Sequence, residues 1–200
     1  MKKYLTVYVS FLMTAAFADD VSFLMLVGPL RDSSGVELAD GSLIQILYVK
    51  DGGTSISTDQ LSAGNFLNSD EQLLYSFSLD SSTTGVAGSF NVNLPDFELK
   101  DDLVAGAAIF MRWWPTLNVT STSPSIGDEY GQTNPLFVVG WNVPSSGEIS
   151  LNYFDTLVGG NVPTGDMKAN YQVVPEPSTY ALGGVVLLGA LVAVRRRKRG

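Results

Sequence analysis

The absence of two reactive residue types limits the chemistry open to this chain, which contains neither histidine nor cysteine. Ser-His-Asp and Cys-His catalytic sites need one of them, as do zinc sites built on His or Cys, haem sites with a His ligand and thiol redox centres. The sequence also has no phosphate-binding glycine loop and no dinucleotide-binding fingerprint. We therefore predict no cofactor, and carboxylate chemistry is the enzymatic route that stays open.

Adjacent acidic residues are the candidates for such chemistry. They occur as three pairs: Asp70-Glu71, Asp101-Asp102 and Asp128-Glu129. A glycosidase needs two carboxylates facing each other across a sugar, whereas neighbours on a strand point to opposite faces. We expect solvated turn acids and no catalytic residue, with a carboxylate-based hydrolase as an alternative.

Two loops rich in Asp and Gly, residues 50–55 and 125–129, raise the question of calcium, which prefers oxygen ligands. Neither loop has the alternating acidic spacing of an EF-hand, so we expect ordinary turns and no metal site.

Aromatic residues give a second alternative, a carbohydrate-binding module, because sugar faces stack on exposed rings. The candidates are Trp113, Trp114, Tyr130, Phe137, Trp141 and Tyr153. The tryptophans lie in apolar stretches, which favours core packing. Arg112 is the charged residue of the apolar run over 105–114 and lies next to Trp113. We therefore expect it to be buried and to form either an ion pair with a carboxylate or a cation–π contact.

The C-terminal tail has three parts in a fixed order. Pro175, Glu176 and Pro177 come first, followed by an uncharged apolar run over residues 180–194. The prolines cannot continue a helix interior, and fifteen helical residues span roughly 22 Å, short enough that flanking arginines must extend toward the headgroups. Five basic residues end the run: Arg195, Arg196, Arg197, Lys198 and Arg199. The positive-inside rule places them in the cytoplasm, so we predict a transmembrane helix over 180–194.

The order of these parts resembles a PEP-CTERM protein-sorting tail. The resemblance is confined to residues 174–200. It implies that an exosortase, a membrane protease of Gram-negative bacteria, recognises Pro175-Glu176-Pro177. It further implies export, transient residence in the inner membrane and release to the cell surface or extracellular matrix, often together with exopolysaccharide and biofilm production.

The N-terminus carries the features of a signal peptide. Lys2 and Lys3 precede an uncharged, mostly apolar stretch, and Ala16 and Ala18 form a small-x-small cleavage site. We predict cleavage after Ala18, although the apolar run over 21–30 offers a competing downstream segment.

The region between the two signals is strongly acidic. Residues 19–174 contain five basic and 19 acidic residues, a net charge of −14. Such a domain repels nucleic acid and anionic lipid, so we exclude both as its partners and expect membrane association during sorting alone.

Alternating apolar and polar residues over 75–79, 90–94 and 149–153 predict half-buried antiparallel strands. The β-branched and aromatic residues over 43–49, which end at a turn signal, predict a further strand. Mostly apolar runs over 105–114 and 136–143, with 21–27 as a further candidate, predict central strands covered on both faces. Residues 59–74 predict one short helix capped by Asp59 or Ser62. The pattern favours an all-β, antiparallel sandwich or jelly-roll-like domain.

These observations divide the chain into a signal peptide (1–18), an extracytoplasmic β-domain (19–169), a linker with the Pro-Glu-Pro motif (170–179), a transmembrane helix (180–194) and a basic cytoplasmic tail (195–200). We expect a non-enzymatic exported protein whose partners are an exosortase and an extracellular polysaccharide.

Overall fold

The computed structural model describes residues 20–57, 59–101 and 103–176, and within them it is all-β, as predicted. The strands are β1 (Asp20–Gly28), β2 (Leu43–Val49), β3 (Glu71–Ser78), β4 (Phe90–Asn93), β5 (Phe97–Glu98), β6 (Ile109–Trp114), β7 (Glu129–Gln132), β8 (Gly147–Phe154) and β9 (Tyr171–Gln172). The short 3-10 helices are η1 (Lys50–Gly52), η2 (Ser81–Thr83), η3 (Thr156–Val158) and η4 (Thr164–Met167).

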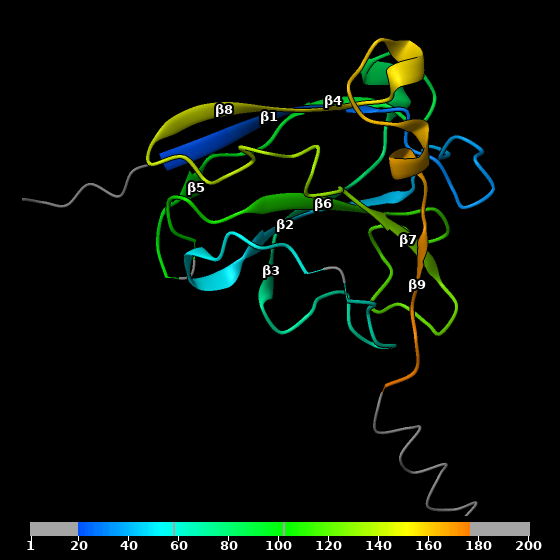
Figure 1. Ribbon diagram of the computed structural model, residues 1–200, viewed down its shortest axis with the longest axis horizontal. Coiled ribbons are helices and arrows are strands. Elements are labelled where there is room, and N and C mark those ends of the chain that lie inside the picture. Colours follow the sequence, from blue (N-terminus) through cyan, green and yellow to red (C-terminus); the bar gives the residue numbers. More distant parts are fainter. Residues whose placement is uncertain (1–19, 58, 102, 177–200) are drawn as a thin grey trace, which may run out of the picture.

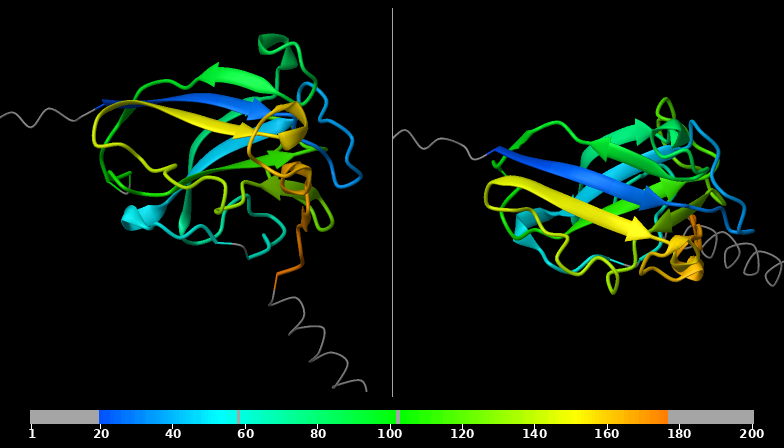
Figure 2. Two further views of the ribbon diagram at one scale, coloured as in Figure 1. Left: turned by 45° about the horizontal axis from the view of Figure 1, so that its top comes forward. Right: turned by 90° about the horizontal axis from the view of Figure 1, so that it is seen from above.

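The strands form two sheets, one lying over the other (Figures 1 and 2). In the first, β1 is central, with β8 along one edge and β4 and β5 along the other. The second has the order β3-β2-β6-β7-β9. Among the described strands every pairing is antiparallel except β1 with β8, which is parallel, so the predicted antiparallel arrangement holds apart from this pair.

A shared hydrophobic core fills the space between the sheets. The first sheet contributes Phe23 and Met25 from β1 and Leu151 from β8, while the second contributes Ile46 from β2 and Met111 from β6. All five side chains are fully buried. Since β1 lies at the centre of its sheet, the apolar run over 21–27 is explained by core packing.

The alternating segments over 75–79, 90–94 and 149–153 overlap β3, β4 and β8, and the apolar runs over 43–49 and 105–114 contain β2 and β6. The run over 136–143, however, forms turns and no strand. Leu136 and Val139 are 76% and 85% exposed, whereas Trp141 is buried. The reason is a turn at Asn134, whose side chain accepts a hydrogen bond from the Leu136 N–H, and a second turn at Gly140, where φ is +88°.

The short helix predicted within residues 59–74 is also absent. Residues 59–70, which we call the covering loop, have no helical segment, and β3 begins at Glu71. The backbone groups of this loop bond to other parts of the molecule, including the N–H of Leu61 to the Tyr130 hydroxyl and the carbonyl of Phe66 to Arg112. Tertiary contacts therefore override the local helical pattern.

Several predicted segments lie outside the described residues. These are the signal peptide with Ala16 and Ala18, Pro177, the apolar run over 180–194 and the basic residues 195–199. Within the part of the chain that the structure describes, no helix has the length and apolarity needed to cross a membrane.

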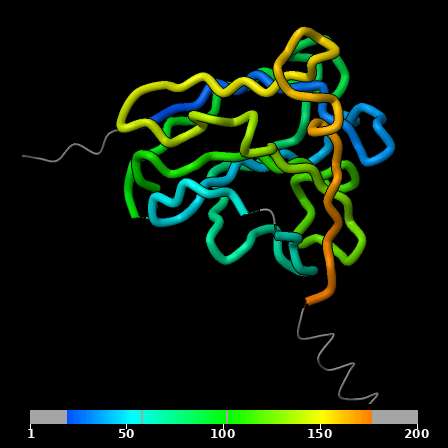
Figure 3. The backbone as a smooth tube through the Cα atoms, viewed as in Figure 1, coloured from blue at the N-terminus to red at the C-terminus, as the bar shows by residue number. Residues whose placement is uncertain are grey.

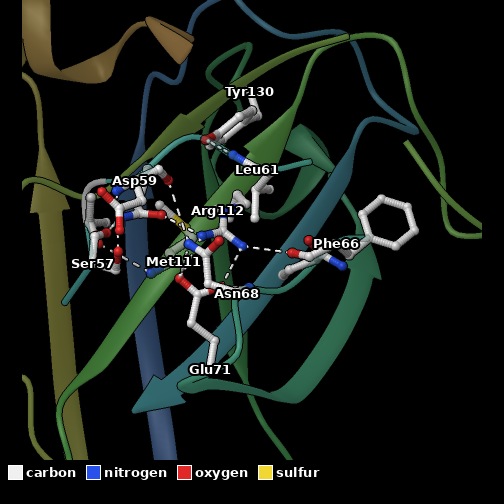
Figure 4. A network of polar contacts seen from close by, with 12 residues as sticks. Ser57, Asp59, Leu61, Phe66, Asn68, Glu71, Met111, Arg112 and Tyr130 are labelled. Carbon is white, nitrogen blue, oxygen red and sulfur yellow. Dashed lines mark hydrogen bonds and ion pairs between the residues drawn. The ribbon is translucent and has the colours of Figure 1, made fainter. Parts of the chain in front are cut away.

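A buried ion pair organises the outer face of the second sheet, the face turned away from the shared core. Arg112 of β6 is 0% exposed and Glu71 of β3 is 1% exposed. The guanidinium donates two hydrogen bonds to the Glu71 carboxylate, at 2.9 and 3.1 Å. It also donates to the Phe66 carbonyl at 2.7 Å and lies 5.4 Å from the centre of the Tyr130 ring (Figure 4). Both predicted contacts of Arg112, a carboxylate pair and a cation–π contact, are confirmed.

The same network joins the covering loop to the sheet. Asn68 donates its backbone N–H and its side-chain amide to Glu71. Gln132 of β7 accepts from Arg112 and donates to the Ser57 carbonyl. These hydrogen bonds partner the Glu71 carboxylate and both terminal nitrogens of Arg112, which offsets most of the cost of burying the cluster, although Arg112 Nε has no hydrogen-bond partner.

We expect Arg112→Met to lower the free energy of unfolding by about 3–5 kcal/mol, because it leaves Glu71 buried and uncompensated. Adding Glu71→Leu should restore part of the loss, since no lone charge then remains. Urea denaturation followed by tryptophan fluorescence measures both. Lys100→Met is the control, because Lys100 pairs with Glu98 on the surface. If Arg112→Met costs no more than Lys100→Met, the network does not hold the fold together.

Candidate functional site: the anchored C-terminal segment

The described chain ends in a segment that is bonded into the second sheet. β9 pairs antiparallel with β7, with Tyr171 opposite Tyr130 and Gln172 opposite Glu129. The segment runs along one end of the domain toward the C-terminus, drawn in orange in Figure 3. The residues just before the Pro-Glu-Pro motif are thus part of the β-domain.

Beyond β9, two valines continue the hydrogen bonding. Val173 donates to the Asp128 carbonyl at 2.9 Å and accepts from the Gly127 N–H at 3.0 Å. Val174 donates to the Leu61 carbonyl and accepts from the Ala63 N–H, both at 2.9 Å. Every backbone polar group of these two valines therefore has a partner on a neighbouring segment.

Side-chain contacts also attach residues 171–174 to the second sheet. Val173 is buried in a small cluster with Leu61, Trp114 and Tyr130, and Tyr171 stacks on Tyr130 with ring centres 5.2 Å apart. The Tyr130 hydroxyl accepts the Leu61 N–H at 3.1 Å. Burial raises the pKa of Tyr130, so its phenol stays neutral around pH 7.

This arrangement corrects the expected domain boundary. We placed the linker at 170–179, yet residues 171–174 are bonded into the domain. Asn170 and the prolines favour an extended linker, which is why we expected one here. Tyr171 and Val173 alternate with polar Gln172, and this short alternation is the pattern of an edge strand. Pro175 has no N–H to continue the pairing, and Glu176 is exposed.

The acidic pairs are scattered. Glu71 is committed to Arg112, and Asp128 accepts the Ser125 N–H at 2.7 Å as part of a turn. Glu129 accepts from the Ser33 hydroxyl. Asp101 lies exposed in a turn, and Asp102 is outside the described residues. Among the residues that the structure describes, no group of acidic side chains is arranged to hold a metal ion.

The tryptophans do not form a sugar platform. Trp113 and Trp114 are fully buried, and Trp141 is 7% exposed. Trp113 faces the shared core and lies directly against Gly131, where any side chain would collide with its indole ring. Trp114 donates to the Gln45 side chain at 2.8 Å on the outer face. Tyr130 and Tyr153 are buried as well, and Phe137 is half-buried. The expectation of core packing is confirmed for the tryptophans.

A groove of about 510 Å³ lies at one side of the two sheets, and sequence reasoning missed it. Its lining includes Leu74, Asp96, Phe97, Glu98 and Asp101. Phe97 and Asp96 lie in the short segment around β5, whose two residues leave no periodic pattern to detect. Asp101 was singled out only as half of an adjacent pair.

Comparison with known proteins found a match for the C-terminal tail of the chain and none for the β-domain. The fold and the anchored segment define an all-β domain whose last hydrogen-bonded residue, Val174, directly precedes Pro175. A family model described as the PEP-CTERM protein-sorting motif matches residues 173–198. This match bears out the resemblance of the tail and indicates an exported protein that is sorted by an exosortase. No curated protein and no solved structure is detectably similar to the chain.

The bond between Tyr130 and Leu61 gives a prediction about the covering loop. Tyr130→Phe should leave the buried Leu61 N–H without an acceptor, which costs about 1–3 kcal/mol. The covering loop and Val174 should then exchange their amide hydrogens with deuterium roughly ten times faster or more. Tyr171→Phe is the control, because the Tyr171 ring contributes a stacking contact to the same cluster. Equal exchange in both variants would contradict the role of the Tyr130 hydroxyl.

Proposed function

We propose that this chain is an exported, non-enzymatic protein of the cell surface or extracellular matrix of a Gram-negative bacterium, delivered by its PEP-CTERM tail. The observation that carries the proposal is the motif match at 173–198, which starts where the hydrogen-bonded domain ends. The helix at 180–194 holds the chain in the inner membrane while an exosortase acts beside its outer end. The basic residues 195–199 stay in the cytoplasm and stop translocation.

The sorting elements have separate roles in this proposal. Pro175, Glu176 and Pro177 form the recognition element on the extracytoplasmic side. Since Val174 is bonded to Leu61 and Ala63, a cut after Val174 leaves β9 and its cluster in the released protein. A cut before Tyr171 would remove β9 and expose Tyr130, so we place processing beyond Val174.

The β-domain then acts at the surface, in association with exopolysaccharide. Buried carboxylates support a non-enzymatic role, because Glu71 pairs with Arg112 and Asp155 lies 3.6 Å from Arg31. The alternative of a carbohydrate-binding module that uses exposed tryptophan rings loses support, because those rings are buried.

Replacing the motif tests the sorting proposal. In an exported reporter fused to residues 174–200, the triple change Pro175→Ala, Glu176→Ala and Pro177→Ala should keep the reporter in the membrane fraction, because the protease no longer recognises it. The control changes Ser178→Ala and Thr179→Ala, which lie beside the motif. Immunoblots of membrane and medium compare the two in cells that produce an exosortase. A triple variant that reaches the medium unchanged would refute recognition of Pro-Glu-Pro.

The N-terminus of the released protein gives a separate prediction. Cleavage after Ala18 yields a mature chain starting at Asp19 and keeps all of β1, which begins at Asp20. A cut within the apolar run over 21–30 would remove the central strand of the first sheet. N-terminal sequencing of secreted protein should therefore read Asp-Asp-Val-Ser, and a mature chain that begins at Met1 would contradict export through a signal peptide.

A further inference from the structure

β3 is the outermost strand of the five-stranded sheet. It pairs with β2 along one side, and on its other side no described strand follows. The backbone N–H and C=O groups that point outward from such a strand form a template for another strand. Proteins usually protect long edges with charges, prolines or short length.

This edge carries none of these protections. Residues 72–79 contain no charged residue, no proline and no glycine. Leu73 is 40% exposed and Tyr75 is 37% exposed. A β-bulge at Leu74 interrupts the pairing between Ile46 and Leu47 of β2, but the four residues of β3 after it, Tyr75 to Ser78, pair regularly with β2 and carry no charge.

The other edges in the described part of the chain differ. β4 has four residues, while β5 and β9 have two each. β8 has eight residues but contains the exposed Glu148, whereas Glu71, the charged residue of β3, is buried against Arg112. β3 is therefore the edge best suited to adding a strand.

Aromatic side chains line β3 on the side facing the other sheet. Tyr75 contacts Phe77 and Phe97, with ring centres 6.1 and 6.4 Å apart, and Phe77 packs edge-on against Phe90 at 5.1 Å. These contacts fix the two rings along the strand while leaving Tyr75 partly open. A strand added beside β3 would cover the open part of Tyr75.

We propose that the occupant of this edge is a second copy of the chain, whose β3 pairs antiparallel with the first about a two-fold axis. An antiparallel pair of identical strands is self-complementary. In a register centred on Ser76, Tyr75 of each copy lies opposite Phe77 of the other, which gives two cross-strand aromatic pairs. No charges face each other within residues 72–79, so the alignment meets no local repulsion.

Overall charge gives this pairing a recognisable salt dependence. Each mature domain carries a net charge of −14, so two copies repel each other until salt screens them. Association through backbone bonds and apolar side chains should therefore strengthen as sodium chloride rises. A contact built on surface ion pairs would weaken instead. The proposal does not depend on how the chain is sorted.

Site-directed disulfide crosslinking tests the pairing. Because the natural chain has no cysteine, any disulfide that forms must involve the introduced residue. Ser76→Cys is introduced into the full-length chain, which is purified in mild detergent, oxidised with copper phenanthroline and run on a non-reducing gel. We expect a dimer band several-fold stronger than for Ser150→Cys, a matched control at an exposed serine of β8. The difference should increase between 50 mM and 500 mM sodium chloride.

A second experiment places a positive charge on the exposed edge of β3. Tyr75→Lys combined with Ser76→Cys should reduce the dimer to the level of Ser150→Cys, because each lysine would then lie opposite Phe77 of the other copy and the two lysines would lie diagonally across the paired strands. Unchanged tryptophan emission, reporting on the buried Trp113 and Trp114, confirms that this variant is folded. Equal crosslinking of Ser76→Cys and Ser150→Cys, or a product whose mass differs from that of a dimer, would overturn the proposal.

Discussion

The burial of Arg112 is the constraint on which the outer half of the molecule depends. Arg112 lies in β6, at the centre of a five-stranded sheet, and its charge is stable there only when an opposite charge and hydrogen-bond acceptors surround it. Glu71, the Phe66 carbonyl and Gln132 supply the partners. Phe66 belongs to the covering loop, and Glu71 is the residue that follows it. Their contacts with Arg112 therefore hold the covering loop against the outer face of the sheet.

The covering loop in turn positions the C-terminus. Its Leu61 and Ala63 bond both backbone groups of Val174, and Leu61 is itself bonded to Tyr130. A continuous path of contacts thus leads from the ion pair to the residue that precedes the sorting motif. This path fixes the position of Val174, the last hydrogen-bonded residue of the domain. Pro175, the first residue of the motif, follows it directly in the sequence.

Sequence patterns predicted the strands where a local signal exists. Alternation found β3, β4 and β8, and uninterrupted apolar residues found β2 and β6. Arg112 beside two tryptophans indicated its own burial, since a lone cation in an apolar strand must find a partner. The sorting motif matched at 173–198 was readable because it is a linear segment whose residue types follow one another along the chain. The failures have a common cause in contacts between distant residues: the turn at Asn134, the fixed covering loop, the parallel pairing of β1 with β8, and the anchoring of Val173 and Val174. No short window of sequence contains these partners.

The distribution of charge links the two proposals. Three of the five cations in the mature domain, Arg31, Arg112 and Lys100, are paired with carboxylates, so little positive charge is left to offset the acidic exterior. An exterior of this kind is repelled by anionic headgroups, so in the proposed sorting route the domain would stay away from the membrane surface. The same repulsion keeps copies apart at low salt. The uncharged edge of β3 is where that repulsion is locally absent, so contact between released domains is directed to one strand rather than spread over the whole surface.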